Sequence, residues 1–376
     1  MVIVEVSDKK TVHDFTRVPF TIYANDPNWV PHLQQEIEEV FNKKENPYFT
    51  HGDCIRWVMY DDNKKPIGRV AAFINNKTAF SFAQPTGGMG FFECINDKKA
   101  AFALFGKCKE WLSHKGMKAM DGPINFGEKD RYWGLLAEGK DKLAIYGMNH
   151  HPEYYKPFFE EYGFAKEYEQ IVYSRSAKNP PNQRLVGLAE RVRRDPNYRF
   201  ESLKKANADK YAEDFRVIYN KAWKAERVDF EEMTKERSLA LMRKLRPVID
   251  EDICWYAYYK DEPIGVYISL PELNEIFQYV HGNFNWWGKL KFLWYQKTKG
   301  CKTMTGMVFG IIPEYQGKGV EAAMFNELGK VILPKNRYDN LLISWIGSFN
   351  EKMIHILVAL LQVVPYKIFI TYRKIF

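Results

Sequence analysis

The stretch Gly310–Phe325, GIIPEYQGKGVEAAMF, decides how the rest of the chain is interpreted. An apolar run typical of a β-strand ends at Pro313, a turn with two glycines follows, and a helix is predicted from about Glu321. Gly317 and Gly319 permit backbone conformations closed to residues with a Cβ atom, and they let a ligand approach the main chain. The first N–H groups of such a helix lack intrahelical partners and favour an anion. The stretch therefore predicts a phosphate-binding turn, with an ordinary tight turn before a helix as the alternative.

The same order of elements occurs in both halves of the chain. An aromatic-rich strand, a charged turn, the tripeptide Pro-Ile-Gly and a second apolar strand make up Arg56–Ile74 in the first half and Cys254–Leu270 in the second. A strand, a helix and a further strand follow in each half, the last near 119–126 and at Asn340–Ile346. This order predicts a mixed sheet with helices packed on it. The repeat indicates two copies of one fold, with chance recurrence of a common hairpin as the alternative.

A polar segment separates the two halves. Residues 177–183, AKNPPNQ, contain two adjacent prolines, which cannot continue a helix or a central strand. We therefore predict two domains, 1–177 and 178–376, in the α/β class of the α+β type. Each would hold a mixed, mostly antiparallel sheet flanked by helices. The length of 376 residues is ample for two hydrophobic cores.

Composition predicts a cytoplasmic protein. The five cysteines are scattered, without a CxxC pair or a metal-ligand spacing to histidine, which favours a reducing compartment and no metal site. We expect no signal peptide and no membrane span, because no apolar run approaches about 20 residues. The net charge of +8 lies in the second half: residues 1–176 carry 23 Lys+Arg against 24 Asp+Glu, and residues 177–376 carry 32 against 23. A basic half suits a polyanionic ligand, although solubility alone explains it equally well.

Ile311–Val320, IIPEYQGKGV, resembles the acetyl-coenzyme A binding motif of the GCN5-related N-acetyltransferases, the GNAT superfamily, here in a tandem two-domain form. The resemblance implies acetyl-CoA or another acyl-CoA as co-substrate, its pyrophosphate on the loop amides and its pantetheine arm along the preceding strand. It also implies an asparagine that opens the helix after the next strand. The residues carried over are Gln316, Gly317, Lys318, Gly319 and Val320 for the pyrophosphate, Gly310 and Ile311 for the pantetheine, and Asn350 for the helix start.

The first half carries a different fragment of the same family. Tyr155–Phe164, YKPFFEEYGF, resembles the signature that closes the GNAT fold, whereas Glu93–Ala101 has no glycine loop. We therefore expect at most one coenzyme A site, in the second half. Two positions depart from the family pattern there. Glu321 places a carboxylate where the motif has Gly or Ala, and Leu357 stands where a tyrosine often acts as general acid.

Acyl transfer to an amine also needs a group that removes a proton, with a pKa near neutrality. The candidates are Glu272, Glu275, His281 and His355. We favour Glu272 or His281, because both precede the strand that would border the acceptor site. A solvated surface residue is the alternative for each.

The adjacent His150 and His151 raise the question of a metal site. No third ligand recurs nearby at a useful spacing, so we expect a structural or surface role for both.

In Asn283–Gly300, aromatic residues alternate with lysines at near-helical spacing. Such a segment can meet a membrane surface, a nucleic acid or an acyl chain. We expect the simpler arrangement instead, in which a helix packs on the sheet and its lysines face outward. The residues expected to pack are Trp286, Leu290, Leu293 and Trp294.

The sequence thus predicts an acyl-CoA-dependent N-acyltransferase that acetylates a small-molecule or peptide amine, with no nucleic-acid partner and with an undefined oligomeric state. Such catalysis depends on positioning and electrostatics more than on one side chain. One alternative is a non-catalytic tandem GNAT scaffold that binds acyl-CoA or a partner, which Glu321 and Leu357 favour. Another is an aminoacyl-tRNA-dependent transferase, the activity of tandem GNAT-like proteins that build peptidoglycan.

Overall fold

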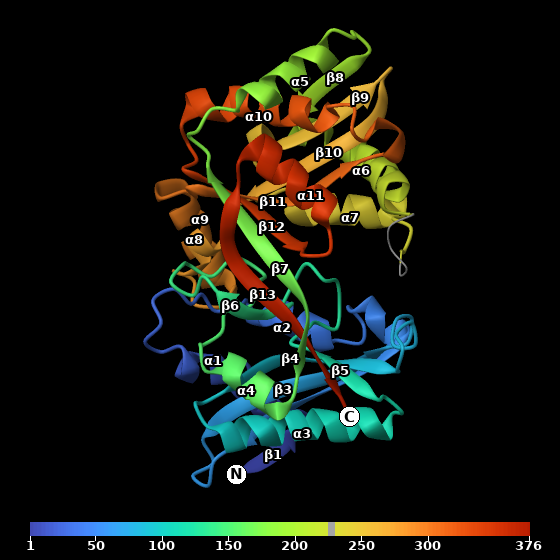
Figure 1. Ribbon diagram of the computed structural model, residues 1–376. Helices are drawn as coiled ribbons and strands as arrows, with labels where there is room; N and C mark the ends of the chain where they lie inside the picture. Colours follow the sequence, from blue (N-terminus) through green and yellow to red (C-terminus); the bar gives the residue numbers. More distant parts are fainter. Residues whose placement is uncertain (225–229) are drawn as a thin grey trace.

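The two halves of the chain are stacked along one continuous sheet (Figure 1). The computed structural model describes residues 1–224 and 230–376. The elements of the first half are β1 (Val2–Glu5), α1 (Lys9–Ile22), α2 (Gln34–Phe41), β2 (Gly52–Tyr60), β3 (Pro66–Asn75), β4 (Thr86–Cys94), α3 (Lys98–His114), β5 (Ala119–Gly122), β6 (Leu135–Glu138), α4 (Tyr155–Tyr162) and β7 (Ala165–Ser176).

The second half repeats this order with additions. Its elements are α5 (Gln183–Arg193), β8 (Tyr198–Ser202), α6 (Ala208–Trp223), α7 (Lys235–Leu245), β9 (Cys254–Tyr259), β10 (Glu262–Pro271), α8 (Asn274–Phe277), α9 (Trp286–Thr298), β11 (Thr303–Ile311), α10 (Val320–Lys335), β12 (Asn340–Gly347), α11 (Glu351–Ile356) and β13 (Val364–Ile375). The repeated Pro-Ile-Gly begins the second strand of the β2–β3 and β9–β10 hairpins, as predicted. The predicted mixed, mostly antiparallel architecture is confirmed.

The halves exchange their last strands. The sheet runs β1-β2-β3-β4-β5-β13-β7-β12-β11-β10-β9-β8, so β13 of the second half pairs with β5 of the first, and β7 of the first pairs with β12 of the second. In Figure 1 these two long strands, green β7 and red β13, cross from one half into the other. The boundary between residues 177 and 178 stays a prediction, but neither half closes its own sheet without the other.

The hydrophobic cores follow this exchange. One cluster fills the second half between the sheet and helices α6 and α10. The cluster of the first half, built around α3 and α4, includes Ile370 and Tyr372 of β13, which are 5% and 1% exposed. The apolar alternation of β13 therefore serves the core of the opposite half.

The expectation for α9 was wrong in its packing. A helix forms at Trp286–Thr298, but the four residues expected to pack on the sheet are all exposed to solvent: Trp286, Leu290, Leu293 and Trp294. The helix lies in a 31-residue connection between β10 and β11, at the edge of the molecule in Figure 1, and Phe292 anchors it instead.

An ion pair ties β13 to the first half and makes the exchange testable. Arg373 donates from Nε and Nη2 to the two carboxylate oxygens of Asp121 at 2.7 and 2.8 Å, with both side chains mostly buried. Arg373→Ala leaves the Asp121 carboxylate buried without this partner, so we expect urea unfolding to show a loss of about 3 kcal/mol. Lys178→Ala removes an exposed pair with Asp339 and serves as the control, expected to change little. Equal losses in both variants would contradict the exchange as a source of stability.

Candidate functional site

The two parallel strands of the second half separate midway. β11 pairs with β12 from Thr303 opposite Asn340 to Gly306 opposite Ile343, although both strands continue beyond these residues. A register shift on the β10–β11 ladder skips Met307, which marks a bulge at the point of separation. β12 stays with β7 on its other side. The edge of β11 beyond Gly306 thus turns away from β12 and leaves main-chain groups for another extended partner.

The glycine turn lies beyond the open end of β11 and leads into α10. Gly317 and Gly319 have φ angles of +71° and +87°, and Gly319 is the N-cap residue of the helix. No side chain of the described residues caps α10, so the first N–H groups of the helix remain available to a ligand. A helix of 16 residues brings its positive dipole end to the same place. The turn therefore has the properties of an anion site.

Two side chains hold the turn against its neighbours. Gln316 donates from Nε2 to the carbonyl oxygen of Ile311 at 3.0 Å, and Lys352 of α11 donates to Gln316 Oε1 at 3.0 Å. Asn350 caps α11 by accepting a hydrogen bond from the N–H of Met353 at 3.2 Å. Lys318 extends over the ring of Tyr315. The structure thus gathers the turn residues, but Gln316 and Asn350 use their side chains within the protein.

Both departures from the family pattern are buried. Glu321 is 8% exposed, and its Oε2 atom has no hydrogen-bond partner among the described residues. A carboxylate in the first turn of α10 benefits from the helix dipole, but it repels a second anion bound there. Leu357 is 2% exposed and belongs to the core of the second half, so no polar group of this residue reaches a substrate.

Gly310 has a structural reason that the sequence did not reveal. A Cβ atom at this position would lie 2.2 Å from the ring of Trp223, which packs on the strand from α6. The neighbouring Ile311 is 6% exposed and pairs with Gly265 of β10. Of the β11 residues, Met307 to Phe309 are the more accessible ones, and sequence analysis missed them because a bulge leaves no mark in this pattern.

The equivalent opening in the first half is filled by the protein itself. β4 pairs with β5 only from Thr86 to Gly88. Residues 123–126 then lie against β4: Ile124 donates its N–H to the carbonyl oxygen of Met89 at 2.8 Å, and a Cβ atom at Gly90 would lie 1.8 Å from the Ile124 oxygen. The main chain thus takes the position that an extended ligand would need.

Glu272, one of the two proposed bases, is buried at the contact between the halves. It is 5% exposed and accepts hydrogen bonds from the N–H of Tyr146 at 2.8 Å, from the N–H of Asn274 at 3.2 Å and from the hydroxyl of Thr305 at 2.8 Å. Burial raises the pKa of its carboxyl to about 7, against the opposing effect of these hydrogen bonds. Its Thr305 partner lies two residues before the bulge in β11.

His281, the other proposed base, lies elsewhere. It is exposed in the turn before α9, with a positive φ of 55°. No hydrogen bond or ion pair in the described part of the chain joins His281 to Glu272. The carboxylate of Glu275 accepts from the N–H of Lys302 at 2.6 Å, which fixes the end of the same connection.

The histidine pair is structural, as expected. His150 and His151 are each 4% exposed; His150 pairs with Asp26 at 2.9 Å, and His151 Nδ1 accepts from the N–H of Leu136 at 3.1 Å. Burial lowers the pKa of His151 to about 3, so its ring stays neutral. Within residues 1–224 and 230–376, no group of three or more metal-ligating side chains comes together.

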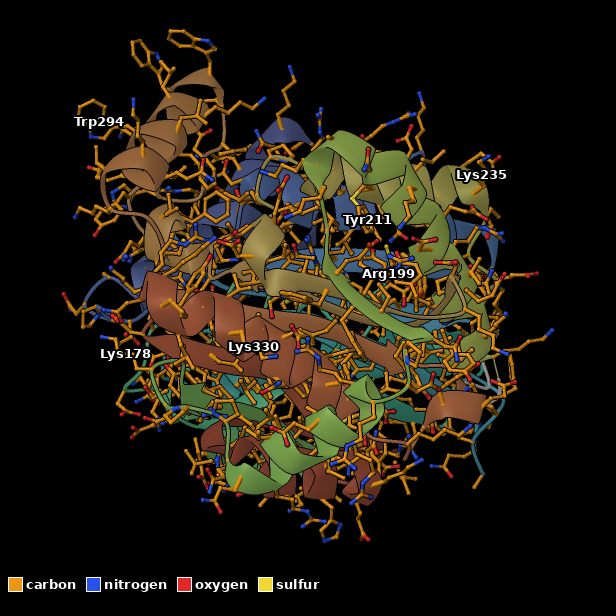
Figure 2. The ribbon with its side chains drawn as sticks, turned by 90° about the horizontal axis from the view of Figure 1, so that it is seen from above. Lys178, Arg199, Tyr211, Lys235, Trp294 and Lys330 are labelled. Carbon is orange, nitrogen blue, oxygen red and sulfur yellow. The ribbon has the colours of Figure 1, made fainter. Side chains whose placement is uncertain are left out.

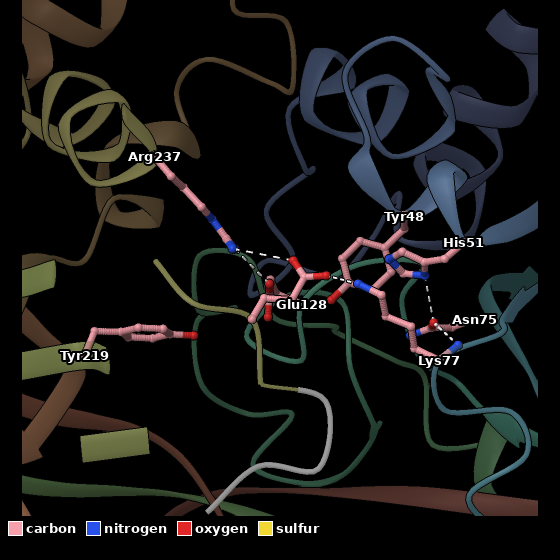
Figure 3. Close-up of a pocket in the computed structure, with 8 residues that line it drawn as sticks. Tyr48, His51, Asn75, Lys77, Glu128, Tyr219 and Arg237 are labelled. Atoms are coloured by element: carbon pink, nitrogen blue, oxygen red, sulfur yellow. Dashed lines mark hydrogen bonds and ion pairs between the residues drawn. The ribbon is translucent and has the colours of Figure 1, made fainter. Parts of the chain in front are cut away.

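A pocket lies between the two halves on the side of α6 and α7 (Figure 3). Arg237 of α7 reaches across to Glu128 at 3.2 Å, and Lys77 of the first half pairs with Glu231. The hydroxyl of Tyr219 points toward this space. The remaining lining residues are Tyr48, His51 and Asn75. Because each carboxylate already faces a cation, the pocket can hold polar groups of either charge.

The pocket connects to the β11 edge through two rings of α6. Tyr219 and Trp223 have ring centroids 5.3 Å apart, and Trp223 covers Gly310. A group held in the pocket and a group held along β11 would therefore approach each other from opposite sides of Trp223. Sequence analysis had no signal for this arrangement, since its residues come from both halves.

Comparisons with known proteins identify the fold. No protein-family model matches the chain. The chain is 28% identical over 368 residues to a curated protein named bacterial ceramide synthase from Caulobacter vibrioides, covering 94% of this chain and 92% of that protein. It is 26% identical over 382 residues to Protein YghO from Escherichia coli, covering 98% and 93%.

Solved structures give the same fold at low identity. A tandem GNAT protein from the clavulanic acid biosynthesis pathway superposes with a TM-score of 0.56 at 12% identity, covering 100% of this chain and 98% of that one. A GCN5-related N-acetyltransferase from Sphaerobacter thermophilus gives 0.50 at 10% identity, covering 99% and 95%. The chain has the tandem GNAT fold.

The raised pKa of Glu272 predicts a pH-dependent stability. The folded carboxyl binds its proton up to about pH 7, whereas the unfolded one releases it near 4.5. The stabilisation is therefore complete below the unfolded pKa and is lost as the pH rises through 7. We expect the difference in free energy of unfolding between wild type and Glu272→Gln to fall by about 3 kcal/mol from pH 5 to pH 8, measured with urea.

Glu275→Gln, in the same connection, is the matched control for this measurement. A wild-type minus Glu272→Gln difference that stays constant from pH 5 to pH 8 would show that Glu272 titrates like a solvated carboxyl.

Proposed function

We propose that the chain transfers an acyl group from acyl-CoA to an amine, with the cofactor in the second half. The observation that carries this proposal is the open β11 edge followed by the uncapped N-terminus of α10. These groups suit a pantetheine arm and a pyrophosphate respectively. The first half supports the assignment by contrast, because residues 123–126 occupy its equivalent opening. Gln316 to Val320 would cradle the pyrophosphate, and the β11 residues up to Gly310 and Ile311 would lie along the arm.

The reaction follows from this geometry. The amine nitrogen attacks the thioester carbonyl carbon, the C–N bond forms as the C–S bond breaks, and coenzyme A leaves as a thiolate that takes up a proton. Main-chain N–H groups at the bulge of β11 can polarise the carbonyl oxygen. Acceptor and donor meet from opposite sides of the strand, so positioning supplies much of the rate.

The base that deprotonates the ammonium is proposed among the two earlier candidates. A carboxyl with a pKa of about 7 suits a general base, and Thr305 separates Glu272 from the β11 edge. Glu272 would then act through the Thr305 hydroxyl, whereas His281 would act from the surface. Comparing the pH profiles of turnover in Glu272→Gln and His281→Gln distinguishes the two.

The acceptor class is suggested by one relative. A ceramide is an N-acylated long-chain amino alcohol, and the name of the Caulobacter relative makes such an amine the first acceptor to test here. We propose a lipophilic amine ahead of a peptide, with acetyl-CoA and a long-chain acyl-CoA both tested as donors. The five free cysteines fit the reducing cytoplasm, where acyl-CoA is made.

The pyrophosphate assignment predicts the effect of a charge in the turn. Gly317→Asp introduces a carboxylate at the open N-terminus of α10, and a Cβ atom there meets nothing within 4 Å. We expect acetyl-CoA binding at least about tenfold weaker by calorimetry, since like charges repel at this short range. Gly116→Asp is the matched control: its φ is +85°, its Cβ also meets nothing, and it lies after α3.

Each outcome of this calorimetry decides something. Affinity lost in Gly317→Asp alone supports the cofactor site, and turnover with long-chain amines then separates an enzyme from a binding scaffold. Wild type that binds no acyl-CoA of either chain length would overturn the proposal. An aminoacyl-tRNA donor would be the next to test.

Glu321 predicts a change in the opposite direction. Its buried carboxylate shares the first turn of α10 with the proposed pyrophosphate. Glu321→Gln keeps the shape and removes the charge, so we expect acetyl-CoA to bind several-fold more tightly, with the larger gain at low salt. Glu327→Gln, on the outer part of α10, controls for a general charge effect. Unchanged affinity at low salt would place the phosphates away from this turn.

A further inference from the structure

Helix α9 presents an apolar face to solvent. Five large apolar side chains are at least 40% exposed, and three of them are tryptophans at 65–67%. They follow helical spacing on one side of the helix: Trp286, Trp287, Leu290, Leu293 and Trp294. Figure 2 shows Trp294 pointing away from the body of the protein on a helix that projects from it. So large an apolar patch marks an interaction surface.

The opposite side of α9 is firmly anchored. Phe292 is 5% exposed and packs on Phe277 and Phe284, with ring centroids 5.1 and 5.6 Å apart. Tyr295 stacks on Tyr279 at 4.2 Å. The same cluster includes residues of the first half, so both halves hold the helix in place. The outer face is therefore a fixed surface and is unused by the core.

The charge around this face has one sign. Lys289, Lys291 and Lys297 are exposed on the same helix, and Lys299 follows its end. Residues 276–313 contain no aspartate or glutamate. Tryptophan and leucine on one face with lysines beside them are the composition of helices that lie in a membrane interface. Lysines next to such a face attract anionic lipid headgroups.

We propose that α9 docks the protein on the surface of an anionic lipid bilayer. The tryptophan and leucine side chains enter the headgroup region, and the flanking lysines contact lipid phosphates. No helix within the described residues is long and apolar enough to cross a membrane, so the attachment is peripheral. A second copy of the chain fits this face less well, because a symmetric α9–α9 contact would bring lysines against lysines with no acidic partner in the segment.

This inference does not depend on acyl transfer, because binding to vesicles needs neither cofactor nor turnover. It does give the proposed lipophilic acceptor a source, since an enzyme held at the bilayer meets its amine there. Failure of vesicle binding would leave the acyl-CoA measurements untouched, and the reverse also holds.

The test is co-sedimentation with vesicles of one part phosphatidylglycerol to two parts phosphatidylcholine. Wild type is expected to bind, and the variant Trp286→Ser/Trp287→Ser/Trp294→Ser to bind at least about tenfold more weakly. Lys289→Gln/Lys291→Gln/Lys297→Gln is expected to lose binding to these vesicles and to lose most of its dependence on salt. Phe80→Ser, which removes a 63% exposed aromatic residue of the first half, is the control and is expected to bind like wild type.

Two outcomes would overturn the proposal. One is wild type that stays in the supernatant with anionic vesicles at low salt. The other is a dimer, detected by sedimentation velocity without lipid, that the tryptophan variant dissociates. Thermal unfolding of each variant verifies folding, and since the substituted side chains are exposed, unchanged midpoints are expected.

Discussion

The departure of β11 from β12 after Gly306 is the constraint on which the second half depends. Two parallel neighbours that stop pairing must satisfy their main-chain groups elsewhere. β12 does so by remaining on β7, a strand from the other half. β11 keeps β10 on one side and leaves the other side free for a ligand. The exchange of strands between the halves is thus what permits the opening, because it gives β12 a partner that does not move with β11.

The two halves solve the same geometric problem in different ways. In the first half, Ile124 bonds to Met89 and the chain closes the opening beside Gly90. In the second half, the strand leads into a glycine turn and a helix without a capping side chain. A duplicated fold can therefore keep its binding geometry in one copy and use the other as support. The buried Glu272 extends that support, since its carboxylate joins Tyr146 of the first half to Thr305 of β11.

Much of the fold could be predicted from the sequence. The Pro-Ile-Gly hairpins, the helix after the glycine turn and the strand at Asn340 all form, since turn residues and apolar runs act locally. The strand near 119 is shorter than expected and ends at Gly122, because the following residues turn to fill the opening. The exchange of β7 and β13 could not be predicted, since it pairs residues far apart in sequence. The site was predicted only in its local part, the turn at Gln316; the bulge at Met307 and the pocket beside Tyr219 depend on tertiary contacts.

The error at α9 has a related cause. Apolar residues at helical spacing usually mark a core-facing stripe, and periodicity alone does not tell which of two apolar faces is buried. On α9 the smaller set, with Phe292, faces the protein.

The position of β13 also has a consequence for how the protein is made. The edge of β5 is complete by residue 122, but its partner β13 begins at residue 364, more than two hundred residues later. As the chain leaves the ribosome, the first half emerges with an unpaired sheet edge and a core that still lacks Ile370 and Tyr372. It must wait in that state while the whole second half is synthesised. Nascent chains of this protein thus present a sticky strand edge for most of translation, a natural place for a chaperone to act.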